Sequence, residues 1–248
     1  MKKPIRIKSV LAALFLGVFL ISCSPDDDNY YIDPDQIAGF MAINTVTDQE
    51  SIGVSLSGVR VGQPLTYRAY TGGYLNIFPG ERSTNSFSPY SGNTLTTLDF
   101  DYKKGNYYSL FITGREDDYD NIVVKDPLND LEVRDSIAYV RYINAIPGAD
   151  STAINVSGKT ASIFEDFAPY QEVSDFIPIK PQTVTVKVET GDETNVEREI
   201  QLEDRKVYTL LIVGDPESDE EWTEPQIRYI ENGKLIKDPE GRQALHLQ

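Results

Sequence analysis

Cysteine, histidine and tryptophan each occur only once in this sequence of 248 residues. Because Cys23 is the single cysteine, no disulfide can form within the chain. The single imidazole, His246, lies close to the C-terminal end, where chains are usually frayed. A Ser-His-Asp or Cys-His catalytic arrangement and a zinc site built on imidazole are therefore not expected. We predict a non-enzymatic protein with no catalytic residues, no bound metal and no cofactor.

Basic side chains are also scarce. Lys and Arg number 23 against 39 Asp and Glu, which gives a formal net charge of −16. Nucleic acid is disfavoured as a partner, because phosphate binding needs clustered Lys and Arg. Hydrophobic residues make up 40% of the chain, enough for a buried core, so wholesale disorder is excluded. The acidity is typical of a protein that stays soluble at a crowded surface.

The N-terminal stretch has the composition of a signal peptide. Lys2, Lys3, Arg6 and Lys8 precede the apolar run Val10–Ile21. That run is too short for a membrane-spanning helix of about 20 residues, but it suits the apolar region of a secretory signal. We predict a signal peptide at residues 1–22. Removing its four basic residues leaves 19 basic and 39 acidic side chains, a formal charge of about −20.

The residues Leu20-Ile21-Ser22-Cys23 resemble a bacterial lipobox. In that family the signal peptidase cuts before the cysteine, whose thiol then carries a diacylglycerol. The resemblance implies a lipid on Cys23 and a membrane as the partner of that lipid. The alternative is an ordinary secretory signal that a cysteine follows by chance.

An acidic run, Ser24-Pro25-Asp26-Asp27-Asp28-Asn29, follows Cys23 directly. It resembles the surface-export signal of some Gram-negative lipoproteins, which implies an outer-membrane anchor facing the cell exterior. The alternative is that the run is only a tether and carries no export signal. The run is too polar to fold, and its three carboxylates lack the fixed cage that Ca²⁺ needs, so residues 23–36 are read as lipidated cysteine and tether. We predict a solvated tether there.

Most of the remaining chain repeats itself at a distance of 100 positions. Ile37–Gly58 resembles Ala138–Gly158, and Lys104–Gly114 resembles Glu203–Gly214. The matching pairs are Asn44 with Asn144, Gly58 with Gly158, Tyr108 with Tyr208, and Gly114 with Gly214. Two copies of one module explain such a period. We predict modules at residues 37–127 and 136–240, joined by a polar connector near Leu128–Asp135, so a fragment from Asp135 to Gln248 should fold alone.

Both modules have the pattern of short strands. Runs rich in Val, Ile, Thr, Tyr and Phe alternate with Gly, Pro, Asn and Asp, and no window predicts an amphipathic helix. Thr183–Val188 alternates strictly, with Val184, Val186 and Val188 inward, and Val207–Val213 is apolar enough for a central strand. Turns are predicted at Pro147-Gly148 and Gly191-Asp192. The pattern predicts an all-β fold of two tandem immunoglobulin-like β-sandwich domains after the lipoprotein signal peptide.

Two acidic stretches follow the repeated glycines, at Arg115–Ser136 and Asp215–Pro225. We predict equivalent acidic loops, with Asn121–Val124 and Gln226–Glu231 as the last strands of the modules. The cluster Asp117, Asp118 and Asp120 lacks the glycine and the terminal Glu of an EF-hand, so a solvated loop is favoured over a metal site. Trp222 either packs across the end of the sandwich or faces a ligand.

Residues 139–158 and 164–214 are similar to the DUF4397 family, a domain of unknown function found in secreted and surface proteins. The similarity rests on VRYINAIPGA, PYQEVSDFIPIKPQTVTVKV and LEDRKVYTLLIVG. It implies an immunoglobulin-like sandwich and no established catalytic residues. Family members often carry Ser-Pro-Asp where this chain has Ile146-Pro147-Gly148, so a role for that aspartate does not transfer.

These features favour a lipid-anchored surface protein that binds a glycan or a protein partner. One alternative is a structural accessory subunit of an outer-membrane complex. Another is a carboxylate-based glycoside hydrolase, because abundant acids can place two carboxylates at a working distance by chance. The sequence singles out no such pair.

A ligand site is predicted in the first module. Arg82, Thr84 and Ser86 stand where the second module has three inward valines, so we expect this strand not to cover the core in the same way. The following tip carries Phe87 and Tyr90 among Ser, Gly and Asn, a mixture that binding loops favour. Tyr70 and Tyr74, which flank Gly72-Gly73, are predicted to join them at the ligand. The alternative is a tolerated loop that has drifted.

Replacing Cys23 with Ala is expected to release the protein from membranes, because the lipid provides the anchor and two or three acyl chains hold a protein stably. Membrane fractionation and intact mass of the wild type provide the test. A variant that stays in the membrane fraction, beside a wild type whose mass shows no lipid, would contradict lipidation.

Overall fold

The computed structural model describes residues 36–148, 151–190, 194–237 and 243–246. Cys23, the tether and the turn predicted at Gly191-Asp192 lie outside these residues. The described chain belongs to a single compact unit, Asp33–Gln248. It contains strands and one short 3₁₀ helix, η3 (Glu221–Thr223), and no α-helix within the described ranges. The predicted all-β class is confirmed.

The strands fall into two halves with the same order. The first half holds β1 (Ala38–Asn44), β2 (Gly53–Leu56), β3 (Val59–Arg60), β4 (Leu75–Ile77), β5 (Gly80–Phe87), β6 (Thr94–Tyr102), β7 (Tyr107–Arg115) and β8 (Asp118–Asp126). The second half holds β9 (Ala138–Ala145), β10 (Thr152–Ser157), β11 (Ser162–Ala168), β12 (Ile177–Ile179), β13 (Thr183–Thr190), β14 (Thr194–Gln201), β15 (Lys206–Val213), β16 (Gln226–Lys237) and β17 (Gln243–His246). His246 therefore belongs to a strand, where fraying was expected.

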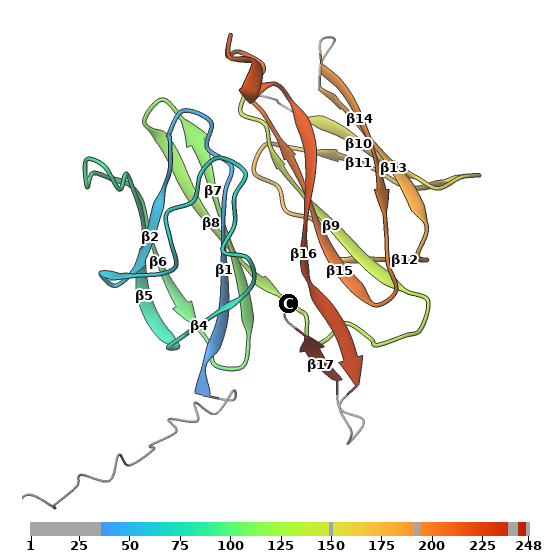
Figure 1. Cartoon of the computed structure of the whole chain (residues 1–248), viewed down its shortest axis with the longest axis horizontal. Coiled ribbons are helices and arrows are strands. Elements are labelled where there is room, and N and C mark those ends of the chain that lie inside the picture. The colour runs from blue at the N-terminus through green and yellow to red at the C-terminus, as the bar shows by residue number, and fades with distance from the viewer. Residues whose placement is uncertain (1–35, 149–150, 191–193, 238–242, 247–248) are drawn as a thin grey trace, which may run out of the picture. The chain divides into compact units, whose positions relative to one another are not determined.

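Each half is a sandwich of two sheets (Figure 1). The sheets of the first half have the orders β4-β1-β7-β8 and β3-β2-β5-β6, and those of the second have β12-β9-β15-β16-β17 and β11-β10-β13-β14. Apart from β17, the second pair repeats the first. In both halves the first long strand pairs in parallel with a strand much later in the chain, β1 with β7 and β9 with β15. The other strand pairs are antiparallel.

Three clusters of buried apolar side chains occupy the described structure. One lies within each sandwich, and the third combines residues from both halves. Along β1, Phe40 and Ala42 enter the first sandwich, whereas Met41 and Ile43 enter the shared cluster. Along β15, Leu210 and Leu211 divide in the same way. Strands covered on both faces need continuous apolar sequence, which confirms the prediction of a central strand at Val207–Val213.

Strand β13 is covered on one face and alternates as predicted. Val184, Val186 and Val188 of β13 are 1%, 0% and 0% exposed and face the core of the second sandwich. The residues between them are half-buried. Strict alternation of period two in the sequence therefore identified this strand and its inward face.

The connector between the halves is anchored by apolar side chains. Leu128 is 1% exposed and belongs to the shared cluster, and Leu131, Val133 and Ile137 pack against it. The stretch expected to be a polar connector therefore contributes to the core that the halves share. A fragment beginning at Asp135 would leave the shared face of β9 and β15 without its cover.

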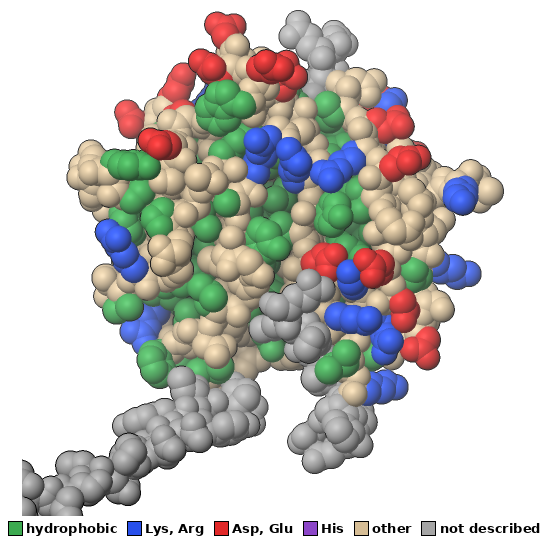
Figure 2. All heavy atoms as spheres, viewed as in Figure 1, with side chains coloured by type: hydrophobic (Ala, Val, Ile, Leu, Met, Phe, Trp, Pro, Cys, Tyr) green, Lys and Arg blue, Asp and Glu red, His purple; other side chains and the backbone are tan. Residues whose placement is uncertain are grey.

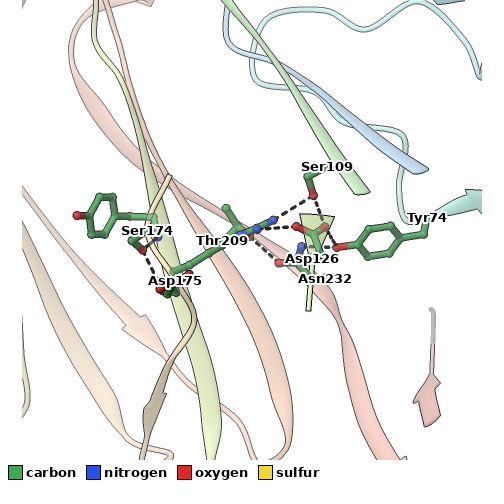
Figure 3. Close-up of polar contacts among 9 residues, drawn as sticks. Tyr74, Ser109, Asp126, Ser174, Asp175, Thr209 and Asn232 are labelled. Atoms are coloured by element: carbon green, nitrogen blue, oxygen red, sulfur yellow. Dashed lines mark hydrogen bonds and ion pairs between the residues drawn. The ribbon is translucent and has the colours of Figure 1, made fainter. Parts of the chain in front are cut away.

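A buried polar network also lies between the halves (Figure 3). Arg141 and Asp126 form an ion pair, with Nη1 and Oδ1 2.5 Å apart and side chains 3% and 0% exposed. Their other hydrogen bonds run through Ser109, Thr209, Asn232 and Tyr74: Arg141 donates to Ser109 and Thr209, Thr209 to Asn232, Asn232 to Tyr74, and Tyr74 and Ser109 to Asp126. The network closes on itself, so each buried charge is both paired and hydrogen-bonded.

Strand β5 does cover the core, but with the hydroxyl side chains of Thr84 and Ser86 in place of the apolar face that β13 presents. Both side chains are 0% exposed. The hydroxyl of Thr84 forms a hydrogen bond with that of Tyr102 at 2.8 Å, and Ser86 donates to Asn121 at 2.6 Å. Asn121 in turn donates to the carbonyl of Thr84. Because the buried hydroxyls find partners inside the sandwich, they are accepted where the other half has valines.

The last strands predicted at Asn121–Val124 and Gln226–Glu231 are confirmed as parts of β8 and β16, but most of the acidic loop predicted at Arg115–Ser136 is wrong. Asp118 begins β8, and the only residues between β7 and β8 are Glu116 and Asp117, with φ of 53° and 71°. Two central residues with positive φ make the tight hairpin turn that matches strand twist. Asp215–Pro225 instead contains η3. The two acidic stretches therefore differ in structure, although each follows the same repeated glycine.

The repeated residues make equivalent structural contacts in both halves. A Cβ atom on Gly114 would lie 2.0 Å from the Asp118 carbonyl oxygen, and one on Gly214 would lie 2.4 Å from Cα of Pro225. The hydroxyls of Tyr108 and Tyr208 each accept a backbone N–H from five residues upstream. The buried side-chain amides of Asn44 and Asn144 each donate to a backbone carbonyl, that of Leu65 in a loop and that of Ala168 at the end of β11. The repeat therefore preserves fold-determining contacts rather than reactive groups.

Replacing Arg141 with Met, the residue that the first half has at the equivalent position 41, is expected to lower the free energy of unfolding by about 3–5 kcal/mol, because Asp126 would remain buried without its cation. Denaturant unfolding measures the loss. Arg134→Met is the matched control: Arg134 pairs with Glu132 with side chains 65% and 62% exposed, so the cost should stay below about 1 kcal/mol. Adding Asp126→Asn to Arg141→Met should restore part of the stability. Equal costs for the two arginines would contradict a stabilising role for the buried pair.

Candidate ligand site at the junction of the halves

The four residues predicted to bind a ligand together occupy three different environments. Phe87 ends β5, and Arg60 stacks on its ring with 5.2 Å to the centroid. Tyr90 is 73% exposed and donates to Glu50 at 3.0 Å. These two lie at the tip as expected.

Tyr74 differs from the prediction. It is 6% exposed, donates to Asp126 at 2.5 Å and meets the ring of Tyr107 edge to face. Burial and the neighbouring Asp126 carboxylate raise the pKa of the Tyr74 hydroxyl well above its usual value of 10. Tyr74 is therefore part of the buried network and not of an exposed binding surface.

Tyr70 lines a pocket between the halves, which we call the junction pocket. Its volume is about 360 Å³. The first half contributes the loop before β4, and the second half contributes β14 and β16. The lining residues are Tyr70, Gly72, Gly73, Arg198, Arg228, Tyr229, Ile230, Glu231, Asn232 and Gly233. Apolar residues of both halves pack in the shared cluster, and this packing brings the two sides of the pocket together.

A β-bulge in β16 forms one wall of the junction pocket. Val207 pairs with Gly233 and Tyr208 with Glu231, so Asn232 is an extra residue on β16. Its side chain is buried and joins the network, accepting from Thr209 and donating to Tyr74. A bulge redirects neighbouring side chains. The pocket wall and the buried ion pair are therefore parts of one hydrogen-bonded structure.

Two arginines of the junction pocket are positioned by hydrogen bonds but lack an acidic partner. Arg198 donates from Nη1 to the carbonyl of Ile227 at 2.7 Å and stacks over Tyr229 with 5.2 Å to the centroid. Arg228 donates from Nε to Gln226 at 2.8 Å. Neither forms an ion pair within 4.0 Å among the residues described here. Lys and Arg side chains gather in a row on the face that β16 crosses, below a group of acidic ones (Figure 2).

A second group of aromatic side chains lies near Arg228. Tyr67 meets Trp222 edge to face at 5.6 Å, and Arg68 lies over the Tyr67 ring at 4.7 Å. Trp222 is 47% exposed and Tyr229 38%. Of the two possibilities for Trp222, the structure therefore shows packing, although about half of the side chain remains open to solvent.

The hydroxyl of Tyr67 is buried and has no hydrogen-bond partner within the described ranges. Burial raises the pKa of Tyr67 to about 12, and the effect is tempered by Arg68 and Arg228 and reinforced by Asp215. Tyr67 is thus close to arginines of both halves, and it links the pocket to the aromatic surface around Trp222.

An ion-pair cluster joins the halves beside Trp222. Arg115 pairs with Asp215 at 2.5 Å and with Glu217, and Arg115 and Asp215 are equivalent positions of the repeat. A second pocket there, of about 270 Å³, has a largely acidic lining. Throughout the described chain, no group of three or more His, Cys, Asp or Glu side chains is placed to hold a metal ion.

Residues 138–238 match the family model described as a domain of unknown function, DUF4397. No curated protein matches the chain in sequence. No helix in the described part is long and apolar enough to cross a membrane.

The chain is also similar to solved structures at low identity. One is provisionally described as a cell adhesion protein of Bacteroides ovatus ATCC 8483: it is 10% identical with a TM-score of 0.27, and the match covers 81% of this chain and 99% of that one. Another is the family CBM26 module of Amy13K from Eubacterium rectale in complex with maltoheptaose, at 9% identity, a TM-score of 0.25, and 77% and 96% coverage. A third, provisionally described as a cell adhesion protein of Bacteroides uniformis ATCC 8492, is 8% identical with a TM-score of 0.23, and the match covers 80% and 100%. Similarity at this level carries no functional assignment.

Sequence reasoning found Tyr70 but missed Arg198, Arg228 and Tyr229. A signal was present: arginine stands beside or near tyrosine in Tyr67-Arg68-Ala69-Tyr70 and again in Arg228-Tyr229. Nothing in the sequence alone places these two segments against one pocket. Their proximity depends on the face that each half presents to the other.

The buried tyrosines predict a loss of stability in alkali. The pKa values of Tyr67, Tyr102 and Tyr208 are each raised from 10 to about 12, mainly by burial. The folded state therefore retains protons that the unfolded state releases, so the contribution of these three hydroxyls to the free energy of unfolding should be constant below about pH 10 and fall between pH 10 and 12. Tyrosinate absorbance followed with far-ultraviolet circular dichroism measures this. Ionisation of every tyrosine near pH 10 in a protein that stays folded would contradict the burial.

Proposed function

We propose that this chain is a non-enzymatic, lipid-anchored protein of the outer-membrane surface, with tandem modules at 37–127 and 136–240, that holds a glycan or protein ligand in the junction pocket. Cys23 would carry the anchor, and the tether would hold the folded part away from the membrane. The observation that supports this most is the junction pocket, which lies where both halves meet and is lined by aromatic rings and arginines.

The lining of the junction pocket suits recognition. Ligand sites combine aromatic and apolar surface with a few placed polar groups, and occur preferentially where two domains meet. Tyr70 and Tyr229 provide rings, while Arg198 and Arg228 provide donors whose positions are fixed by hydrogen bonds. Groups already held in place lose little conformational freedom on binding. The pocket therefore offers a preorganised surface.

The same lining does not suit glycoside hydrolysis. That reaction needs two carboxyl groups about 5–10 Å apart around the scissile bond. Of the residues that line the junction pocket, Glu231 is the one carboxylate, and Lys206 Nζ pairs with it at 3.1 Å. The pocket supports binding better than acid–base chemistry.

A second function, as an accessory subunit, is favoured by a different surface. Val59 and Phe78 are 70% and 69% exposed beside an apolar groove of about 370 Å³. The groove lies next to β3 and β4, which are edge strands of the two sheets of the first half. Exposed apolar surface beside unpaired edges commonly marks a contact with another protein.

The test is a glycan and protein array probed with the soluble protein from Ser24 to Gln248. Arg228→Ala with Tyr229→Ala is expected to weaken binding to the identified ligand at least about tenfold, because it removes a donor and a ring from the pocket. Phe87→Ala with Tyr90→Ala is the comparison at the tip and should leave binding unchanged. The reverse pattern, in variants that melt cooperatively, would move the site to the tip.

A further inference from the structure

We propose that the ligand of the junction pocket is an acidic saccharide, whose carboxylate or sulfate group is bound by Arg198 and Arg228. This inference rests on the proposed function, since it assumes that the junction pocket is the binding site. It adds the chemical class of the ligand.

The first reason is the placement of positive charge in an acidic protein. The chain carries a formal charge of −16, so most of its surface repels anions. In the described structure some cations, such as Lys103, Arg115 and Arg134, are paired with carboxylates, whereas others, such as Arg82 and Lys104, lie apart on the surface without an ion pair. Arg198 and Arg228 line one pocket without such a partner, and Arg68 and Arg228 both lie near Tyr67. Like charges gathered in one place repel one another unless an anion joins them.

The second reason is that both guanidinium groups have free donors and fixed positions. A guanidinium carries five N–H groups. Arg198 uses Nη1 for the carbonyl of Ile227, and Arg228 uses Nε for Gln226. The remaining N–H groups are available, and their planar fork matches the oxygens of a carboxylate or sulfate. The pocket is therefore built for an anionic group.

The one acidic residue in the pocket lining does not cancel this charge. Glu231 accepts from Lys206 Nζ at 3.1 Å, and Lys206 also pairs with Glu203 at 2.7 Å. Hydrogen bonds to these two carboxylates raise the pKa of Lys206, so its charge persists at neutral pH. Lys206 therefore offsets part of the Glu231 charge, and the two arginines of the lining outnumber its one carboxylate.

The third reason concerns the body of the ligand. A volume of about 360 Å³ lies at the small end of ligand sites, which measure about 300–1,000 Å³, whereas a folded partner buries about 800 Å² per side. Gly72 and Gly73 contribute no side chains to the lining, and a Cβ atom on Gly72 would meet nothing within 4 Å. The backbone at Gly72 therefore leaves the opening unobstructed, and the partly exposed rings of Tyr229 and Tyr70 provide aromatic surface beside it for a sugar ring.

A saccharide is favoured over an acidic peptide because the adjoining strand edge is partly occupied. An extended peptide binds most readily by adding a strand to a free sheet edge. Between Gln226 and Gly233, β16 pairs with β15 and not with β17, but Arg198 already donates to the carbonyl of Ile227 there. Adding a strand would require this bond to break.

Isothermal titration calorimetry of the protein from Ser24 to Gln248 tests the proposal. The probes are an oligogalacturonate, its carboxyl-reduced form, a heparin-derived oligosaccharide and poly-glutamate. We expect at least one acidic saccharide to bind, and the carboxyl-reduced form and Arg228→Gln to weaken binding by about tenfold or more. Arg228→Lys should recover only part of the affinity, because it restores charge but not the fork. Lys104→Gln, the same charge change at an exposed residue outside the pocket lining, should have no effect.

The outcomes separate the two proposals. Equal binding of neutral and acidic saccharides, weakened by Tyr229→Ala but not by Arg228→Gln, would overturn the acidic class and leave the junction pocket as the site. Binding of poly-glutamate without any saccharide would replace the saccharide with an acidic peptide. If no probe binds, and if binding to the ligand identified on the array is unchanged in every variant of the junction pocket, both proposals are overturned.

Discussion

The ion pair between Arg141 and Asp126 is the constraint on which the arrangement of this protein depends. Both side chains are almost wholly buried between two sheets, so each charge would be costly without the other. Ser109 and Thr209, equivalent positions of the repeat, both bind the same guanidinium. Hydrogen bonds have strict geometry, so this network specifies how the halves meet, while the surrounding apolar cluster provides most of the stabilisation.

This constraint extends to the candidate site. Asn232 belongs to the network and, through the bulge in β16, also to the wall of the junction pocket. Tyr74 belongs to the network and directly follows Gly72 and Gly73, which form the opposite wall. Under the proposed function, a ligand between Arg228 and Tyr70 would need these walls at a fixed separation. The buried pair thus stabilises the shape of the pocket without contacting a ligand.

Local patterns predicted much of the fold. The 100-residue spacing matches strands that recur in the same order, and the alternation at Val184, Val186 and Val188 identified an inward face. Where local patterns were not enough, distant partners decided the outcome. Thr84 is accepted inside the core because Tyr102 and Asn121 satisfy it, and Tyr74 is buried by partners 52 and 158 residues away. The pocket was missed for the same reason, since Tyr70 and Arg228 are neighbours only after folding.

The central claim is that the halves share a core and therefore unfold together. Differential scanning calorimetry of the protein from Ser24 to Gln248 tests this most directly. The account predicts one transition whose calorimetric enthalpy equals the van't Hoff enthalpy, since a cooperative unit unfolds in a single step. Two resolved transitions, each with the enthalpy of about 100 residues, would show that the halves are independent and would contradict the account.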